Sequence, residues 1–178
     1  MLVRPHLRSD ADRIAEILAA GWAQAYAAFM PPGFFEPRSN PDYRRSEIAE
    51  WLDTDFDPAS EALFVAEEEE RVVGFIHMVL GDKADFGAAG FVNLLYVDRH
   101  MQRRGVGRAL MSAGAAWLIQ QRPGPLVLSA YRDNPFRHAY AAMGGYEARQ
   151  VTHIIEAREI VSVLYLWTDP LSLLQGNR

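Results

Sequence analysis

The feature that most constrains the fold is a strand, a basic loop, a helix that starts on two glycines and a second strand, in that order. Residues 91–97 are almost continuously apolar, which is typical of a strand covered on both faces. Residues 105–121 follow with apolar side chains at helical spacing, and residues 126–131 again favour a strand. Such a unit predicts two parallel strands joined by a right-handed crossover.

Other elements are expected on both sides of this unit. The further strands are expected at residues 3–7, 63–66, 72–80, 150–156 and 160–167. The further helices are expected at residues 9–30, 42–52 and 135–143, with a loop at residues 34–41. The order predicts a mixed α/β fold on one sheet, and the length of 178 residues predicts a single domain over residues 1–178.

Composition excludes several classes of protein. The chain has no cysteine, which rules out disulfides, thiolate metal sites and a cysteine nucleophile, and we expect no metal. A net charge of −5 argues against nucleic acid as the partner. We see no apolar run long enough to span a membrane and no signal-peptide pattern in residues 1–10, so we expect a cytoplasmic protein with no membrane partner.

The basic loop has the chemistry of an anion site. Free N–H groups and the helix dipole favour an anion at the start of the helix, and glycine at Gly105 and Gly107 lets a diphosphate approach the backbone. Arg103, Arg104 and Arg108 add positive charge. The dinucleotide fingerprint requires a third glycine where Leu110 stands, and the P-loop requires a Gly-Lys-Ser/Thr end that is missing, so neither fits.

Two motifs resemble the GNAT superfamily of N-acetyltransferases. Leu-Tyr-Val at 95–97, followed by Gln-Arg-Arg-Gly-Val-Gly at 102–107, is similar to the loop with which that family binds the pyrophosphate of acetyl-CoA. Asn134-Pro135, Tyr140 and Gly144-Gly145 resemble its second cofactor motif. The order of elements also matches, so the resemblance covers essentially the whole chain.

The resemblance implies a fold, a co-substrate and a set of site residues. The fold is a mostly antiparallel sheet of about seven strands with a parallel, splayed central pair and about four helices. The co-substrate is acetyl-CoA, bound like an added strand in the slot between the splayed pair. The implied cofactor-binding residues are Leu95, Tyr96, Val97, Gln102, Arg103, Arg104, Gly105, Val106, Gly107, Arg108, Asn134 and Tyr140.

Acetyl transfer to an amine requires an oxyanion donor, an acid for the thiolate and a base for the amine. The resemblance assigns the Val97 amide to the oxyanion and Tyr140 to the acid. Counting from Asn134 in the family's usual register reaches Ala141 instead, and Tyr140 is favoured because only it has an acidic group. The alternative is that Tyr140 is a packing residue. The base is His77, or water relayed by Asn93 or by backbone carbonyls, because the 91–97 strand lacks the family's usual glutamate.

The resemblance places the acceptor, a primary amine of a small molecule or peptide, between the first two helices and the last hairpin. Glu36, Asp53 and Asp55 suggest a cationic amine. Most aromatic residues of this region are expected to pack as core or lid; they are Trp22, Tyr26, Phe29, Phe34 and Phe35.

Two other interpretations stay open. The first is a sensor or regulatory module that binds acetyl-CoA without transferring the acetyl group, which the missing strand glutamate suggests. The second is a structural or partner-binding domain whose glycines merely start a helix. Residues 165–167 and 171–174 are candidate homodimer contacts.

Overall fold

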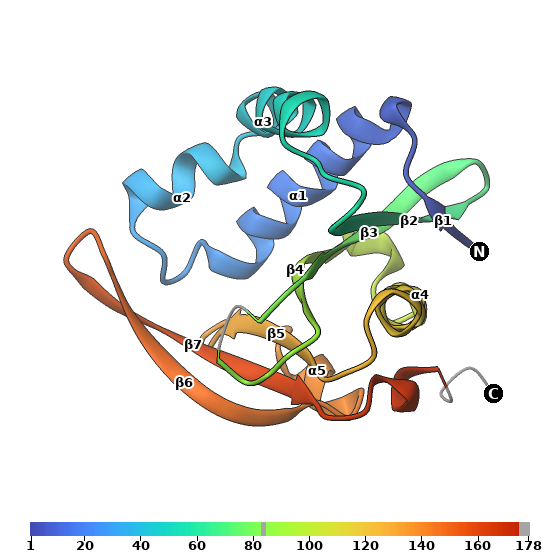
Figure 1. Ribbon diagram of the computed structural model, residues 1–178. Coiled ribbons are helices and arrows are strands. Elements are labelled where there is room, and N and C mark those ends of the chain that lie inside the picture. The colour runs from blue at the N-terminus through green and yellow to red at the C-terminus, as the bar shows by residue number, and fades with distance from the viewer. Residues whose placement is uncertain (83–84, 175–178) are drawn as a thin grey trace.

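The computed structural model describes residues 1–82 and 85–174 (Figure 1). The strands are β1 Leu2–Pro5, β2 Glu61–Glu68, β3 Arg71–Leu80, β4 Gly90–Val97, β5 Leu126–Tyr131, β6 Tyr146–Ile155 and β7 Arg158–Trp167. The helices are α1 Ala11–Tyr26, α2 Pro32–Ser39, α3 Pro41–Thr54, α4 Val106–Gln121 and α5 His138–Ala142. Short 3₁₀ turns lie at Arg8–Asp10, Arg99–Met101 and Pro170–Leu173.

The seven strands form one sheet in the order β1-β2-β3-β4-β5-β7-β6. Every neighbouring pair is antiparallel except β4 and β5, which are parallel. The predicted fold class is therefore confirmed, including the single parallel pair at the centre. In the described part of the chain, no helix is both long and apolar enough to cross a membrane.

One predicted loop is a helix. Residues 34–41 were expected to form a loop because of their prolines, but α2 occupies Pro32–Ser39. Pro32 lies in the first turn, where a missing N–H costs nothing and a fixed φ suits a helix. Phe34 and Phe35 also pack against the core beside α1, which stabilises this short segment.

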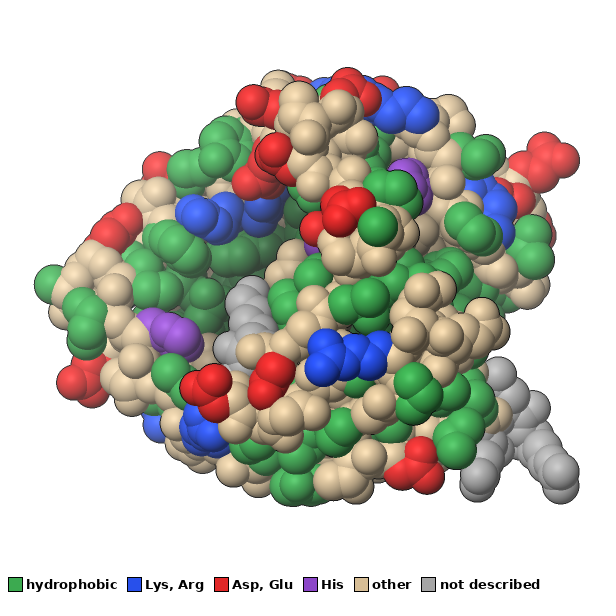
Figure 2. All heavy atoms as spheres, in the orientation of Figure 1, with side chains coloured by type: hydrophobic (Ala, Val, Ile, Leu, Met, Phe, Trp, Pro, Cys, Tyr) green, Lys and Arg blue, Asp and Glu red, His purple; other side chains and the backbone are tan. Residues whose placement is uncertain are grey.

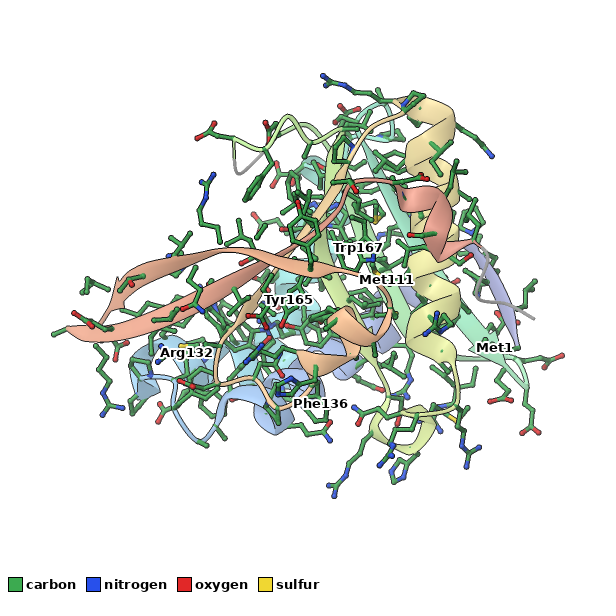
Figure 3. The ribbon with its side chains drawn as sticks, turned by 90° about the horizontal axis from the view of Figure 1, so that it is seen from below. Met1, Met111, Arg132, Phe136, Tyr165 and Trp167 are labelled. Atoms are coloured by element: carbon green, nitrogen blue, oxygen red, sulfur yellow. The ribbon has the colours of Figure 1, made fainter. Side chains whose placement is uncertain are left out.

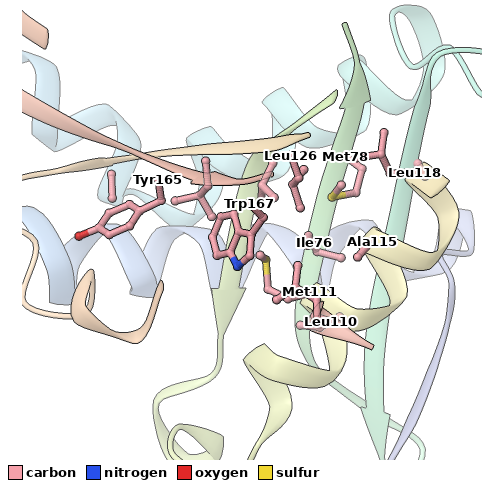
Figure 4. Packing of buried hydrophobic residues seen from close by; sticks show 14 of the residues in the cluster. Ile76, Met78, Leu110, Met111, Ala115, Leu118, Leu126, Tyr165 and Trp167 are labelled. Atoms are coloured by element: carbon pink, nitrogen blue, oxygen red, sulfur yellow. The ribbon is translucent and has the colours of Figure 1, made fainter. Parts of the chain in front are cut away.

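The sheet has a helical layer on each face (Figure 1). Side chains alternate along β3, so that Phe75 packs with α1 and α3 while Ile76 and Met78 face α4. Figure 4 shows Ile76 and Met78 within the cluster that α4 covers, together with Trp167 and Leu126. The space between α4 and the sheet is thus filled by an apolar core.

The β6–β7 hairpin extends past the sheet toward the start of α2 (Figure 1). Its tip turns on Glu156 and Ala157, with φ of 46° and 61°. A Cβ placed on Gly33 would lie 2.4 Å from the Glu156 Oε1 atom, so the tip touches the start of α2. This contact joins segments far apart in the sequence.

The segment at residues 165–167, a candidate homodimer contact, lies inside the chain. Tyr165, Leu166 and Trp167 are at most 6% exposed. The Trp167 indole donates to the Met143 carbonyl at 3.0 Å, and Figure 3 shows its ring beside Met111. Of the second candidate segment, Leu171 is exposed. Tyr165 and Trp167 therefore hold α4 and α5 against the sheet, while Leu166 packs on the opposite face, and a homodimer stays a prediction.

Candidate active site

A slot opens where the two parallel strands separate. β4 and β5 pair only from Gly90 with Leu126 to Val92 with Leu128. At the next residue of β4, Asn93, the register against β3 shifts by one, because His77 pairs with Leu94 and Met78 with Val92. This bulge bends β4 away from β5. A cavity of ≈ 560 Å³ lies between the two strands where they separate.

The expectation that β4 is buried on both faces is therefore wrong for its second half. Asn93 is exposed, and residues 94–97 are only partly buried, although they are apolar. Leu94, Leu95, Tyr96 and Val97 all line the slot. Their apolar surface and the free edge of the β4 backbone face a space of the size that a ligand needs.

The basic loop is held in a fixed shape at the base of the slot. The Asp98 carboxylate accepts from the His100 amide at 3.0 Å and also pairs with Arg13 of α1. Burial raises the pKa of Asp98, but these two partners outweigh burial and lower it below its ordinary value. Arg103 and Gly105 then take left-handed conformations, with φ of 63° and 84°, before α4 starts at Val106.

Packing within the chain does not explain why Gly105 and Gly107 lack a side chain. A Cβ on Gly105 would have nothing within 4 Å, and one on Gly107 would meet only a Val97 methyl at 3.8 Å, an ordinary contact. Gly105 is favoured by its positive φ, but Gly107 has no such reason. Both line the slot, so the room that they leave is room for a ligand.

Some residues of the loop and of the start of α4 line the slot, and others do not. Gln102, Arg103 and Arg108 line the slot, whereas Arg104 and Val106 do not. Val106 is a core residue, so only its backbone is available to a ligand. Among the described residues, no carboxylate lies within ion-pair distance of the loop arginines Arg103, Arg104 and Arg108. Their charge is free to attract an anion.

Tyr140 lies on the opposite wall of the slot, on α5. The hydroxyl makes no hydrogen bond to another described residue, and the ring packs against Tyr165 at 5.4 Å between centroids. Burial is the main reason that its pKa is raised well above the ordinary value of a phenol. Ala141, the residue reached in the alternative register, does not line the slot. The Tyr140 hydroxyl is therefore a protonated group beside the cavity.

The end of α5 explains the paired glycines of the second motif. Gly144 has a φ of 90°, and a Cβ on Gly145 would lie 2.6 Å from the Trp167 ring. Asn134 starts the same segment, and its buried side chain accepts from the Phe136 amide at 2.9 Å. Asn134 and Phe136 line the slot, and Figure 3 shows Phe136 below the end of the β6–β7 hairpin.

His77 is buried behind the slot and does not line it. The Asn93 side-chain amide donates to His77 Nδ1 at 3.1 Å, and His77 Nε2 lies 2.8 Å from a Glu61 carboxylate oxygen. The imidazole packs on Trp51, with 4.6 Å between ring centroids. Burial, followed by Asp57 and Asp55, raises the pKa of Glu61. Asn93 is thus the slot end of a chain that runs through the buried imidazole to the partly exposed Glu61 carboxylate.

Several lining residues and Glu61 are not predicted by the sequence. Gly21 and Gln24 of α1 line the slot, and Gln24 exchanges hydrogen bonds with Gln102. A glycine inside a helix signals a close approach, and a Cβ on Gly21 would lie 2.4 Å from the Tyr96 ring. Glu61 gave no signal, because only the register of β2 against β3 brings it to His77. No cluster suited to a metal occurs among residues 1–82 and 85–174.

The sequence profile of the acetyltransferase (GNAT) family matches residues 22–145, a span that includes the slot, the basic loop and Tyr140. This chain belongs to the GNAT acetyltransferase family. The predicted family is confirmed, and so is the prediction of an acetyl-CoA-dependent N-acetyltransferase. No curated protein matches this GNAT acetyltransferase in sequence.

Solved structures agree on the fold. A GCN5-related N-acetyltransferase from Rhodopseudomonas palustris has a TM-score of 0.71 at 19% identity, over 94% of each chain. The yncA protein of Salmonella typhimurium, bound to its cofactor acetyl-CoA, has a TM-score of 0.68 at 17% identity, over 100% of this chain and 96% of its own. A ribosomal-protein-alanine N-acetyltransferase from Brucella melitensis has a TM-score of 0.69 at 16% identity, over 94% and 99%.

Proposed function

We propose that this enzyme transfers the acetyl group of acetyl-CoA directly to a primary amine of a small molecule or peptide, with the cofactor lying in the slot between β4 and β5. The parting of these strands beyond Val92 and Leu128 is the observation that carries the proposal. It frees one edge of β4, on which the amide-rich arm of the cofactor can pair like an added strand. A single domain over residues 1–178 and a cytoplasmic location belong to the same proposal.

The cofactor diphosphate is proposed to lie against the start of α4. Amides after Gly105 point out of the first helical turn, and the helix dipole adds to their attraction for an anion. Gly107 leaves room for the phosphates, and Arg103 and Arg108 line the same place. Asn134 and Phe136 flank the arm from the α5 side. Arg104, which does not line the slot, contributes through its charge.

The transfer needs no covalent enzyme intermediate. The amine nitrogen attacks the thioester carbonyl carbon, the carbonyl oxygen becomes an oxyanion, and the C–S bond breaks to release CoA. We assign the oxyanion to the Val97 amide. The thiolate takes its proton from Tyr140, whose raised pKa keeps it protonated. A thiolate in the same apolar slot is also desolvated, and this raises its affinity for the proton.

The amine proton has two candidate routes. In one, it passes through water at Asn93 to His77, whose other nitrogen is held by Glu61. In the other, water held by Asn93 and backbone carbonyls carries it out of the slot, and His77 only orients Asn93. Because His77 is buried, neither route has the amine touching the imidazole.

The base can be identified from pH–rate profiles of His77→Ala and Asn93→Ala. If His77 accepts the proton, His77→Ala changes the shape of the profile as well as its height. If His77 only positions Asn93, both variants lower the rate and leave the shape unchanged. Profiles of both variants that match the unmodified enzyme in height and shape would remove both residues from the mechanism.

The main test is release of free CoA thiol from acetyl-CoA with a panel of amino acids, polyamines, aminoglycosides and peptides. Tyr140→Phe should lower kcat about 100-fold or more, the usual contribution of a general acid, without changing the affinity for acetyl-CoA. An unchanged kcat would show that Tyr140 is a packing residue. Binding of acetyl-CoA without turnover of any amine would favour the sensor alternative.

A further inference from the structure

The acceptor side of the slot has an aromatic wall. Trp22, Tyr26 and Phe34 come from α1 and α2, with ring centroids 4.6 Å apart for Trp22 and Tyr26 and 5.9 Å apart for Trp22 and Phe34. Tyr131, at the end of β5, meets Tyr26 at 5.5 Å. Of these four residues Tyr26 lines the slot, so the aromatic cluster borders the cofactor space.

Two guanidinium groups lie over this wall. The Arg38 guanidinium carbon is 3.7 Å from the Phe34 ring centroid and 5.7 Å from that of Trp22. The Arg44 guanidinium carbon is 5.2 Å from the Trp22 centroid. Figure 2 shows Lys or Arg side chains at the border of a hollow between the helices and the hairpin, with apolar side chains inside it.

Only one of the two charges is neutralised within the described chain. Arg44 is buried, pairs with Glu47 and donates from Nε to the Arg38 carbonyl at 2.8 Å. Arg38 donates to the Phe34 carbonyl at 3.0 Å, and no carboxylate among residues 1–82 and 85–174 lies within 4 Å of it. A half-buried guanidinium with free donors is a site for a carboxylate, because a charge-assisted pair satisfies both groups.

The positive charge acts on the slot. Burial raises the pKa of Tyr131, and the charge of Arg38 opposes that rise. Burial likewise raises the pKa of Tyr96, and Arg44 opposes it. Both guanidiniums therefore stabilise negative charge on the side of the sheet where the acceptor enters.

The acids that suggested a cationic acceptor do not balance this charge. On the exposed surface, the Asp53 carboxylate accepts hydrogen bonds from Arg8 Nε at 2.7 Å and from Arg8 Nη2 at 2.8 Å. Glu36 is exposed on α2. Neither Asp53 nor Glu36 forms an ion pair with Arg38, so these acids leave the charge of this guanidinium unneutralised.

We propose that the acceptor is a primary amine that carries a carboxylate, and that Arg38 binds this carboxylate while the apolar part of the molecule lies against the partly exposed Phe34 and Tyr131 side chains. The inference rests on the proposed transferase function and specifies its substrate class. The carboxylate belongs to a free amino acid or to the C-terminus of a short peptide. Both sources carry the carboxylate that Arg38 binds, and they differ in the distance between this carboxylate and the amine.

The test compares acceptors that differ in one group. L-phenylalanine carries the carboxylate, L-phenylalaninamide and 2-phenylethylamine lack it, and glycyl-L-phenylalanine places it farther from the amine. For the unmodified enzyme we expect kcat/KM to be at least about tenfold higher for one of the two carboxylates than for either neutral analogue. The better carboxylate distinguishes an amino acid from a peptide.

Variants tie this preference to Arg38. Arg38→Gln should lower kcat/KM for the carboxylate substrates about 10- to 100-fold, mainly through KM, and leave the neutral analogues unchanged. Arg45→Gln is the matched control, since Arg45 lies on α3 and pairs with Asp42. Arg38→Lys should restore part of the preference. A thermal shift with CoA, equal in all variants, shows that the slot is intact.

The outcomes separate the inference from the function. Equal use of neutral and anionic amines, or a carboxylate preference that survives Arg38→Gln, would overturn the inference and leave the transferase function standing. If no amine is acetylated, calorimetric titration of L-phenylalanine and the dipeptide into the CoA complex tests whether the anion site exists. Binding that requires Arg38 supports the anion site without the transferase function, and no binding overturns the site as well.

Discussion

The two ends of the slot are built in different ways. The cofactor end is one continuous piece of chain, from β4 through the basic loop into α4, and its ligand-facing groups are mainly backbone amides. The acceptor end is assembled from α1, α2, the end of β5 and the β6–β7 hairpin, and its groups are the aromatic and arginine side chains that the helices carry. In the proposed function, the first end recognises its ligand through chain conformation and the second through side-chain identity.

This difference predicts how each end responds to substitution. A backbone site tolerates changes in most side chains but not the addition of bulk where a phosphate must approach. A side-chain site is sensitive to most side-chain substitutions, because each side chain makes its own contact with the ligand. Substitutions at the two ends should therefore separate cleanly into effects on CoA and effects on the acceptor.

The largest effect on CoA affinity is expected for Gly107→Ala. The chain has room for the methyl group, 3.8 Å from Val97, so the free protein should melt at an unchanged temperature. The methyl group would occupy space proposed for the diphosphate and weaken its hydrogen bonds to the amides. We expect CoA affinity to fall about 10- to 100-fold in calorimetric titration. Unchanged CoA affinity would mean that the phosphates do not approach α4.

Asp98→Asn should have the next largest effect, because Asp98 fixes the loop through Arg13 and His100. We expect a loss in CoA affinity of about threefold to tenfold, since a charge-assisted hydrogen bond is weakened. Glu16→Gln is the matched control, because Glu16 also pairs with Arg13 but lies on the exposed side of α1. An equal loss in both variants would show that Arg13 and not Asp98 holds the loop.

The same residue gives a pH dependence with a definite sign. The pKa of Asp98 is lower in the folded chain than its ordinary value near 3.8. Its contribution to stability is therefore full above that value and is lost as the pH falls through the lower folded pKa. Thermal melting of the enzyme and of Asp98→Asn should differ by a constant amount from pH 8 to pH 5, and the two should converge in stronger acid.

The sequence predicts the elements on both sides of the basic loop well because their signals are local. Gly105, Gly107 and the strand before them lie within one short stretch, and β5 has the predicted bounds. The α2 helix could not be predicted, since prolines that usually interrupt helices lie at its first turn and near its end. The contacts of Glu61 with His77 and of Arg38 with Trp22 depend on strand register and helix packing, and no local pattern encodes them.

A smaller effect, confined to the acceptor end, is expected for Phe34→Ala. Removing the ring under the Arg38 guanidinium loses a cation–π contact at 3.7 Å, and the acceptor KM should rise about threefold to tenfold. Phe35→Ala is the control, because Phe35 also packs beside α1 but has no such contact with Arg38. CoA affinity should be unchanged in both. A loss of CoA affinity in Phe34→Ala would show that the two ends are coupled.

Asp53→Asn should have the smallest effect. Asp53 is exposed and held in a two-point pair by Arg8, and this hydrogen bonding lowers the pKa of its carboxyl group. Because that pair lies away from the slot, kcat/KM for L-phenylalanine and for 1,4-diaminobutane should each stay within about twofold of the unmodified enzyme. A drop in kcat/KM for the diamine alone would mean that surface acids, and not Arg38, determine which acceptor is used. Selectivity would then come from charge at a distance, and the division between a backbone end and a side-chain end would no longer account for it.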